Sequence, residues 1–384
     1  MNRICLIIHS MREIKLYKQY ENFFNLGVAL SSFFLMGDNE LYSYFDNISK
    51  YLSQVKQKGT EIPDIGKIKK DTIEVLNYAK TQFNVIVSEN DCKMQYIYKD
   101  QNELDYTWSD RYVMFAKENN QKLRWHTLVW HSQVAEWIFY DENKKYVSKE
   151  ILDKRLKFYI DSLGNRYKND IYSIDVVNEC ISDKTFYLRD GKEKSLWYEI
   201  LGESYIEKAF LYAKDSFPNS ELVINDYNLE SVRKKRESLY NLVKKLLNKG
   251  IPIDAVGLQM HINLQIPSVQ EIEDTIKLFG SLGVKVIITE MDISIYNDKS
   301  DEKIFEKQKI ITPDILEIQA ERYYSIFECF KRQAKAGILK DVVLWGITDR
   351  FSWRNNFPVP GRVDAPLLFD RKGNPKPAYF KLIN

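Results

Sequence analysis

Two glutamates stand where apolar segments of this sequence end. Glu179 closes the run IYSIDVVNE at residues 171–179, and Glu290 lies in VKVIITEMDI at residues 284–293. Glutamate is almost never fully buried without a partner. A carboxylate at the end of an apolar strand therefore either marks the point where the chain reaches solvent or is placed there for chemistry. Two such carboxylates can divide acid and base roles if their environments differ, so they are the first candidates for a reactive site.

Eight apolar or β-branched runs could position such residues. They are FNLGVAL (24–30), FNVIVSEN (83–90), KLRWHTLVW (122–130), IYSIDVVNE (171–179), ELVINDYN (221–228), IDAVGLQMHI (253–262), VKVIITEMDI (284–293) and VVLWGITD (342–349). Most of them are continuously apolar, which is typical of parallel strands covered on both faces. Segments with helical periodicity lie between them, as at 231–250 and 318–337, where a glycine closes each segment. The basic stretch RKKRES at 233–238 is interpreted as a solvated helix face.

Strand followed by helix, repeated eight times, predicts an α/β fold, a single-domain (β/α)8 TIM barrel. A doubly wound open sheet is the alternative, but it usually has fewer strands and often a glycine-rich first turn. We expect the barrel to cover residues 23–384, with an insertion after the first strand at about residues 37–80. Residues 1–22 are interpreted as an N-terminal leader that could be disordered, or as the start of the first strand, rather than as a signal peptide.

Seven of the eight runs end in polar or aromatic residues. Because the carboxyl ends of barrel strands meet on one face, residues far apart in the sequence should converge there. Polar residues also end strands for structural reasons alone, but seven such ends with so little serine or glycine favour a site. The candidates are Glu89, Asn90, His126, Trp130, His131, Asn178, Glu179, Asp226, Asn228, Gln259, His261, Glu290, Asp292, Trp345 and Asp349.

The residue types in this predicted pocket suit the hydrolysis of glycosides. One carboxylic acid can protonate the leaving oxygen while a second carboxylate attacks the anomeric carbon, and tryptophan faces can stack on sugar rings. Glu290 and Asp292 are two apart on a strand and share a face, which would bring both beside His261. A zinc site at His126, His131 and His261 would have the right residue type but poor ligand spacing, so we expect no metal and no cofactor.

Several motifs resemble glycoside hydrolase family 10, the β-1,4-xylanases. They occur in family order over about residues 23–384: FNVIVSENDCK (83–93), HTLVWHSQ (126–133), DVVNE (175–179), NDYN (225–228), GLQMH (257–261), ITEMDI (288–293), WGITDRFSW (345–353) and PLLFDRKGNPKPAY (366–379). The resemblance implies a retaining endo-1,4-β-xylanase that hydrolyses internal bonds of xylan or xylo-oligosaccharides by double displacement. A β-1,4-glucan hydrolase of the same clan and a non-catalytic xylan-binding barrel are the alternatives.

By this resemblance Glu290 is the nucleophile and Glu179 is the acid/base, about 5–5.5 Å apart as in retaining enzymes. His261, Asp292 and Asn178 would support them, and Asn178 would bond the 2-hydroxyl of the sugar. The sugar contacts that the resemblance implies are Glu89, Asn90, Lys93, His126, Trp130, Gln133, Tyr227, Gln259, Trp345 and Trp353.

Several positions depart from the pattern of the family without removing a catalytic group. They bear on the shape of the sugar subsites. Trp125 and Met94 could narrow the glycone side of the cleft or form its floor, and the insertion at 37–80 could add a wall, which would favour a decorated xylan or a short xylo-oligosaccharide. The departures are Cys92, Met94, Trp125, Ala135, Ile174, Met260 and Arg354.

Composition excludes other functional classes. A net charge of +2 without a basic stripe does not suit nucleic-acid binding, and no apolar run is long enough to span a membrane. No obligate protein partner is evident, so the expected partner is xylan or a xylo-oligosaccharide. The scattered Cys5, Cys92, Cys180 and Cys329 indicate free thiols. The N-terminal apolar run is too short for a typical secretory signal, which favours a cytoplasmic location over secretion.

Overall fold

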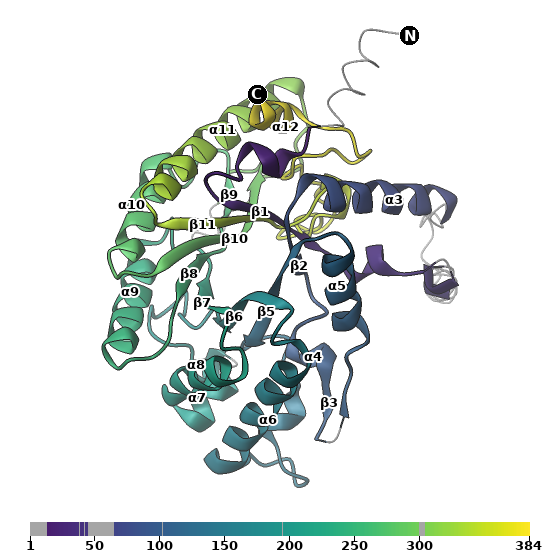
Figure 1. The fold of residues 1–384 in the computed structure, drawn as a ribbon. Coiled ribbons are helices and arrows are strands. Elements are labelled where there is room, and N and C mark those ends of the chain that lie inside the picture. Colours follow the sequence, from purple (N-terminus) through teal and green to yellow (C-terminus); the bar gives the residue numbers. More distant parts are fainter. Residues whose placement is uncertain are drawn as a thin grey trace.

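Parallel strands form a closed barrel in the computed structural model, which describes residues 14–37, 39–41, 43–44, 65–101, 103–193, 195–298 and 304–384. Eight of the nine strands in the main sheet pair in a ring, and the last pairs back on the first (Figure 1). In order they are β1 (Asn25–Leu30), β2 (Val85–Ser88), β5 (Lys122–Val129), β6 (Ile171–Asn178), β7 (Glu221–Asp226), β8 (Ala255–Leu258), β10 (Lys285–Ser294) and β11 (Leu339–Leu344). This ring confirms the predicted (β/α)8 TIM barrel, and the open-sheet alternative is wrong.

Helices cover the outside of the barrel (Figure 1). The longer ones are α3 (Ile65–Gln82), α5 (Thr107–Glu118), α6 (Lys149–Tyr167), α8 (Ser204–Ser216), α9 (Arg233–Asn248), α10 (Val269–Gly280) and α11 (Pro313–Lys335). Helices α9 and α11 confirm the helical segments predicted at 231–250 and 318–337, but α11 begins several residues earlier. Thr312 caps its first turn by accepting a bond from the Ile315 amide, and proline suits the first helical position.

Short elements complete the connections between strands and helices. The short strands are β9 (His261–Asn263), which extends the sheet beside β10, and the hairpin β3 (Tyr98–Asp100) and β4 (Glu103–Leu104). The short helices are α4 (Met94–Ile97), α7 (Leu196–Leu201) and α12 (Pro377–Ile383), with 3-10 turns η1 (Leu16–Gln19), η2 (Ser32–Leu35), η3 (Glu136–Phe139), η4 (Gly191–Glu193) and η5 (Asp349–Phe351). No helix among the described residues has the length and apolar composition that a membrane span needs.

The strands are apolar on both faces because both faces are buried. One face packs with the helices in a large cluster that includes Ile86, Leu123 and Leu222. The other face fills the barrel, where Val223, Ala255 and Ile287 pack on each other. Alternation along β5 places Trp125 on the outer face, fully buried with its ring 5.5 Å from that of Tyr167 on α6. The expectation that Trp125 narrows the sugar cleft is therefore wrong.

Residues ahead of β1 pack on the barrel. Leu16 and Tyr20 are buried, the Tyr20 hydroxyl donates to the Leu382 carbonyl at 2.9 Å, and the Leu16 amide donates to Gln82 at 3.0 Å. Residues before the predicted boundary at residue 22 therefore pack on the barrel just as the residues after it do. Half of the insertion predicted at 37–80 lies outside the described residues, and its last part forms α3.

Candidate active site

Asn225 on β7 connects the surroundings of the two candidate glutamates. Its Nδ2 donates to Glu290 Oε1 at 2.9 Å and to Asn178 Oδ1 at 2.8 Å. Asn178 ends β6 and Glu179 follows it directly. A Cβ atom on Gly257 of β8 would collide with the Asn225 side chain, so glycine there allows this close approach. The carboxyl ends of β6, β7 and β10 therefore bring the two glutamates to one site.

Glu179 is partly buried and accepts hydrogen bonds from two neutral donors. Gln259 Nε2 donates to its Oε1 at 3.0 Å and Trp130 Nε1 donates to its Oε2 at 2.8 Å. Burial raises the pKa of Glu179 above its ordinary value, and the carboxylates of Asp226 and Glu290 add to that rise. The two hydrogen bonds oppose the rise without cancelling it.

Glu290 lies in β10 among positively polarised groups. His261 Nε2 lies 3.3 Å from its Oε2, and His126 Nδ1 lies 4.0 Å from its Oε1. Burial by itself would raise the pKa of Glu290, but the imidazoles of His126 and His261 outweigh it and hold that pKa below its ordinary value. The two carboxyl groups thus have their pKa values shifted in opposite directions.

His261 lies between Asp292 and Glu290, as the strand spacing predicted. Its Nδ1 is 2.9 Å from Asp292 Oδ2. Burial lowers the pKa of His261, but Asp292 and Glu290 together overcome this and raise it to about 9. Asp292 also accepts bonds from Trp353 Nε1 at 2.8 Å and from Arg354 Nε at 2.5 Å. His261 is therefore a cation at neutral pH that donates to both carboxylates.

The predicted sugar-binding residues at the ends of β2 and β5 form one linked group. Lys93 Nζ donates to Asn90 Oδ1 at 2.9 Å and to Gln133 Oε1 at 2.7 Å. The same ammonium lies 4.8 Å from the centroid of the Trp130 ring. Burial raises the pKa of the neighbouring Glu89 to about 7. These residues present an aromatic face and several polar atoms beside Glu179.

Two tryptophan rings pack edge to face against the histidines of the site. The ring of Trp345 lies 5.3 Å from that of His126, and the ring of Trp353 lies 4.8 Å from that of His261. His126 Nδ1 is also 2.9 Å from Asp175, which pairs with buried Arg124 at 2.5 Å. Both histidines are thus bonded to aspartates. Among the described residues, no group of three or more His, Cys, Asp or Glu is arranged to hold a metal ion.

A cluster of charges around Tyr227 was missed by the sequence analysis. The Tyr227 hydroxyl bonds Asp183 and accepts from Arg189 Nη2 at 2.7 Å, and the Lys235 ammonium lies 3.4 Å from its ring centroid. The expectation that residues 233–238 form a solvated face is wrong for Lys235, whose side chain is 0% exposed. Helical spacing could have predicted this burial. Lys235 lies four residues before the apolar Leu239, so both side chains lie on the buried face of α9.

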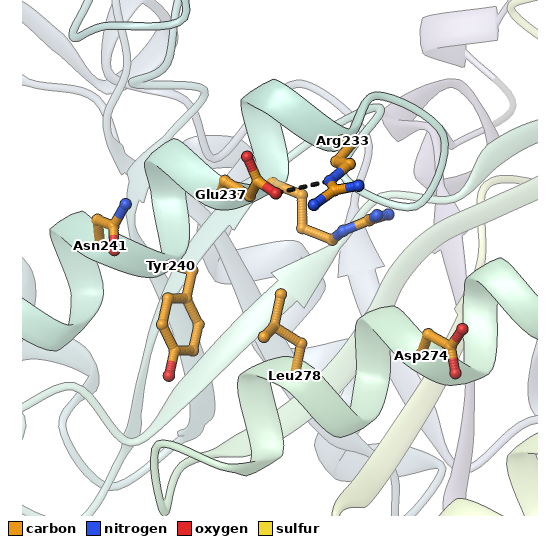
Figure 2. Close-up of a pocket in the computed structure, with 7 residues that line it drawn as sticks. Arg233, Glu237, Tyr240, Asn241, Asp274 and Leu278 are labelled. Atoms are coloured by element: carbon orange, nitrogen blue, oxygen red, sulfur yellow. Dashed lines mark hydrogen bonds and ion pairs between the residues drawn. The ribbon is translucent and has the colours of Figure 1, made fainter.

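A separate hollow lies on the outer helix layer. It has a volume of about 500 Å³ and opens between α9 and α10 (Figure 2). Its lining consists of Arg233, Arg236, Glu237, Tyr240, Asn241, Asp274 and Leu278. None of these residues belongs to a strand end, so this hollow is distinct from the site around Glu179 and Glu290.

The cysteines among the described residues are free thiols, as predicted. Cys92, Cys180 and Cys329 are free and buried, and Cys5 lies outside the described residues.

The chain is similar in sequence to proteins named as xylanases. The chain is 39% identical to a β-1,4-xylanase of Dictyoglomus thermophilum over 338 residues, which cover 85% of the chain and 92% of that protein. It is 41% identical to endo-1,4-β-xylanase C of Paenibacillus barcinonensis, of which it spans 28%.

Solved structures superpose on nearly the whole chain. The structure of GH10 from Paenibacillus barcinonensis matches with a TM-score of 0.82 at 35% identity and covers 97% of both chains. A mutant structure in complex with xylotriose matches with a TM-score of 0.80 at 34% identity, covering 97% of this chain and 99% of that one. Residues 49–384 match the model of Glycosyl hydrolase family 10, and the chain belongs to that family.

Proposed function

We propose that this protein is a retaining endo-1,4-β-xylanase in which Glu290 is the nucleophile and Glu179 is the acid/base. The observation that carries the proposal is the placement of Glu179 directly after β6 and Glu290 in β10, linked through Asn178 and Asn225, with surroundings that shift their pKa values in opposite directions. Membership of the family and the named activities of its relatives support the substrate class, which is xylan or xylo-oligosaccharides.

The first step uses each carboxyl group in the state that its surroundings favour. Ionised Glu290 attacks the anomeric carbon while protonated Glu179 gives its proton to the glycosidic oxygen, and the bond between that oxygen and the anomeric carbon breaks. A covalent glycosyl–enzyme ester remains on Glu290. Glu179 is then a carboxylate that takes a proton from water, and that water attacks the anomeric carbon from the face that the leaving group occupied. The bond from this carbon to Glu290 breaks, so Glu290 is released as a carboxylate and Glu179 is protonated again.

Asn178 is suited to bond the sugar bound at this site. It is 2% exposed, and its Oδ1 accepts bonds from Asn225 at 2.8 Å and Gln259 at 3.4 Å. Its Nδ2 is buried and has no hydrogen-bond partner among the described residues. A buried donor without a partner is costly, and a sugar 2-hydroxyl next to the anomeric carbon would satisfy it. Such a bond strengthens as charge develops in the transition state.

The remaining polar and aromatic residues fit the two sides of the cleaved bond. The group of Glu89, Asn90, Lys93, Gln133 and Trp130 would hold the sugar that becomes attached to Glu290, together with His126, Trp345 and Trp353. Gln259 would orient the Glu179 carboxyl, to which it donates. Tyr227 would face the leaving portion of the chain.

The test is the release of reducing ends from xylan by the wild-type protein and two variants. Glu290→Ala and Glu179→Ala should each lower kcat by about a thousand-fold or more, since each removes a group that forms or breaks a bond. Glu118→Ala, which changes an exposed glutamate on α5, is the control and should act like the wild type. Turnover near the wild-type rate in either catalytic variant would contradict the assignment. Faster cleavage of carboxymethylcellulose than of xylan would favour the β-1,4-glucan alternative.

A further inference from the structure

The buried side chain of Lys235 has no role in the proposed mechanism. Its Nζ lies 2.9 Å from Asp226 Oδ1 and 2.8 Å from Asp183 Oδ1, above the ring of Tyr227. The side chain is 0% exposed, so a substrate in the cleft cannot reach it. A buried ammonium is expensive unless charges and hydrogen bonds compensate it, and here two carboxylates and a ring face do so.

Two chains of bonds run from Lys235 to the backbone around Glu179. Through the first, Asp226 Oδ2 accepts a bond from the Ile181 amide at 3.1 Å. Through the second, Asp183 Oδ2 accepts from Arg189 Nη2 at 3.0 Å, and Arg189 Nε donates to the Glu179 carbonyl at 3.0 Å. Both chains therefore end on residues 179–181, and the Lys235 ammonium joins them.

The backbone of Glu179 needs such support. Its φ is 54°, in the left-handed region that few residues other than glycine adopt. A residue in this region keeps its conformation only where the surrounding structure holds it. Glu290 differs, since it lies inside β10, where strand pairing determines its direction. The aim of the Glu179 carboxyl therefore depends on groups outside the strand that precedes it.

We propose that Lys235 is a positioning residue for Glu179: by joining the Asp226 and Asp183 chains it holds the Glu179 backbone so that the carboxyl group points at the glycosidic oxygen. This inference rests on the proposed function, because it assumes that Glu179 delivers the proton to the leaving group. It requires no contact between Lys235 and the substrate.

The leaving group of an aryl β-xylobioside can reveal this role. When the bond to the anomeric carbon breaks, its electron pair moves to the phenolic oxygen. Dinitrophenolate is stable enough to leave without a proton, whereas unsubstituted phenol needs the proton of Glu179. In Lys235→Met, kcat/KM should fall about ten-fold or more for the phenyl substrate and less than about three-fold for the dinitrophenyl substrate. Both aglycones occupy the same place, so a loss of binding alone would affect them alike.

Two further variants make the test decisive. Lys245→Met makes the same change on α9 at a lysine that is 51% exposed and paired with Glu203, and it should match the wild type on both substrates. Of the two chains, Asp183→Asn weakens only the second, because it removes the carboxylate charge that pairs with Lys235 and Arg189. The Asp183 side chain is 42% exposed, and the variant should show the same selective loss, though smaller. If Lys235→Met does not fold, the ratio of the losses of Asp183→Asn on the two substrates tests the positioning role.

Equal losses on the two substrates, or no loss on either, would overturn the positioning role. Failure of the proposed function looks different. In that case the wild-type protein would cleave neither substrate, or Glu290→Ala would cleave the dinitrophenyl substrate as fast as the wild type does.

Discussion

Glu179 and Glu290 carry the same chemical group, and only their neighbours distinguish them. Glu179 accepts bonds from two neutral donors and faces other carboxylates, whereas Glu290 faces two histidines. Burial penalises the charged form of both. Neighbouring charges therefore decide the direction in which each pKa is shifted. They add to the effect of burial at Glu179 and outweigh it at Glu290. The rate should accordingly depend on pH through two groups, with Glu290 on the acidic limb and Glu179 on the basic limb.

Replacing His261 with glutamine should move the acidic limb. His261→Gln keeps a donor beside Glu290 but removes a positive charge, so the pKa of Glu290 rises and the group stays protonated, and inactive, up to a higher pH. We expect the acidic limb of kcat/KM for 4-nitrophenyl β-xylobioside to move up by about one pH unit. The basic limb is the internal control, because His261 is not among the main groups acting on Glu179. An unchanged acidic limb would refute this account of Glu290.

At the scale of elements, the site depends on how closely neighbouring strands approach. Asn225 on β7 bonds residues of β6 and β10, and its Oδ1 accepts a bond from Thr289 of β10 at 2.7 Å. Gly257 on β8 leaves the space that the Asn225 side chain occupies. The interior of the barrel thus contains a polar network around Asn225 in addition to its apolar side chains.

Gly257→Ala should therefore damage both stability and activity. The added methyl group meets the Asn225 side chain and must displace it, at a cost of about 1–3 kcal/mol in the free energy of unfolding. The displaced amide no longer connects Asn178 and Glu290, so kcat on xylan should fall about ten-fold or more.

Thr312→Ala is the matched control for this loss of stability. It removes the cap of α11 and costs about 1 kcal/mol, but should leave kcat unchanged. Urea unfolding and xylan hydrolysis measure the two effects. Full activity of Gly257→Ala would show that the Asn225 network is dispensable.

Across the whole molecule, the two ends of the barrel have different tasks. The carboxyl ends of the strands carry the candidate catalytic groups. Around the opposite ends, segments from both ends of the described chain are joined: Gln82 Oε1 accepts bonds from the Leu16 amide at 3.0 Å and from the Tyr379 hydroxyl at 2.9 Å. Figure 1 shows η1 and α12 lying close together there. Contacts at this end can therefore stabilise the fold without touching the chemistry.

Shortening the chain tests this division and the boundary predicted at residue 22. A protein that begins at residue 23 lacks Leu16 and Tyr20, both of which are buried, and should lose about 3–6 kcal/mol relative to one that begins at residue 14. Below the unfolding transition the two should have the same kcat on xylan. Urea unfolding measures the difference, and equal midpoints would show that residues 14–22 do not belong to the barrel.

The sequence by itself determined the fold and predicted which residues would meet at the candidate site. Continuous apolar strands imply burial on both faces, eight repeats imply closure, and the motifs at the strand ends carry the two glutamates and the neighbours of His261. These inferences hold because they depend on local periodicity and on residue type. Local pattern also misleads: RKKRES is strongly charged, yet its third residue lies on the buried face of α9.

Only the tertiary structure decided what each side chain faces. Trp125 packs against α6 instead of the cleft, Asn225 connects the surroundings of the two glutamates, and Lys235 finds two buried carboxylates. Periodicity predicts the face on which a residue lies, but the partner comes from a distant part of the chain. The opposite pKa shifts of Glu179 and Glu290 arise in the same way, because burial and neighbouring charge exist only once the strands are assembled.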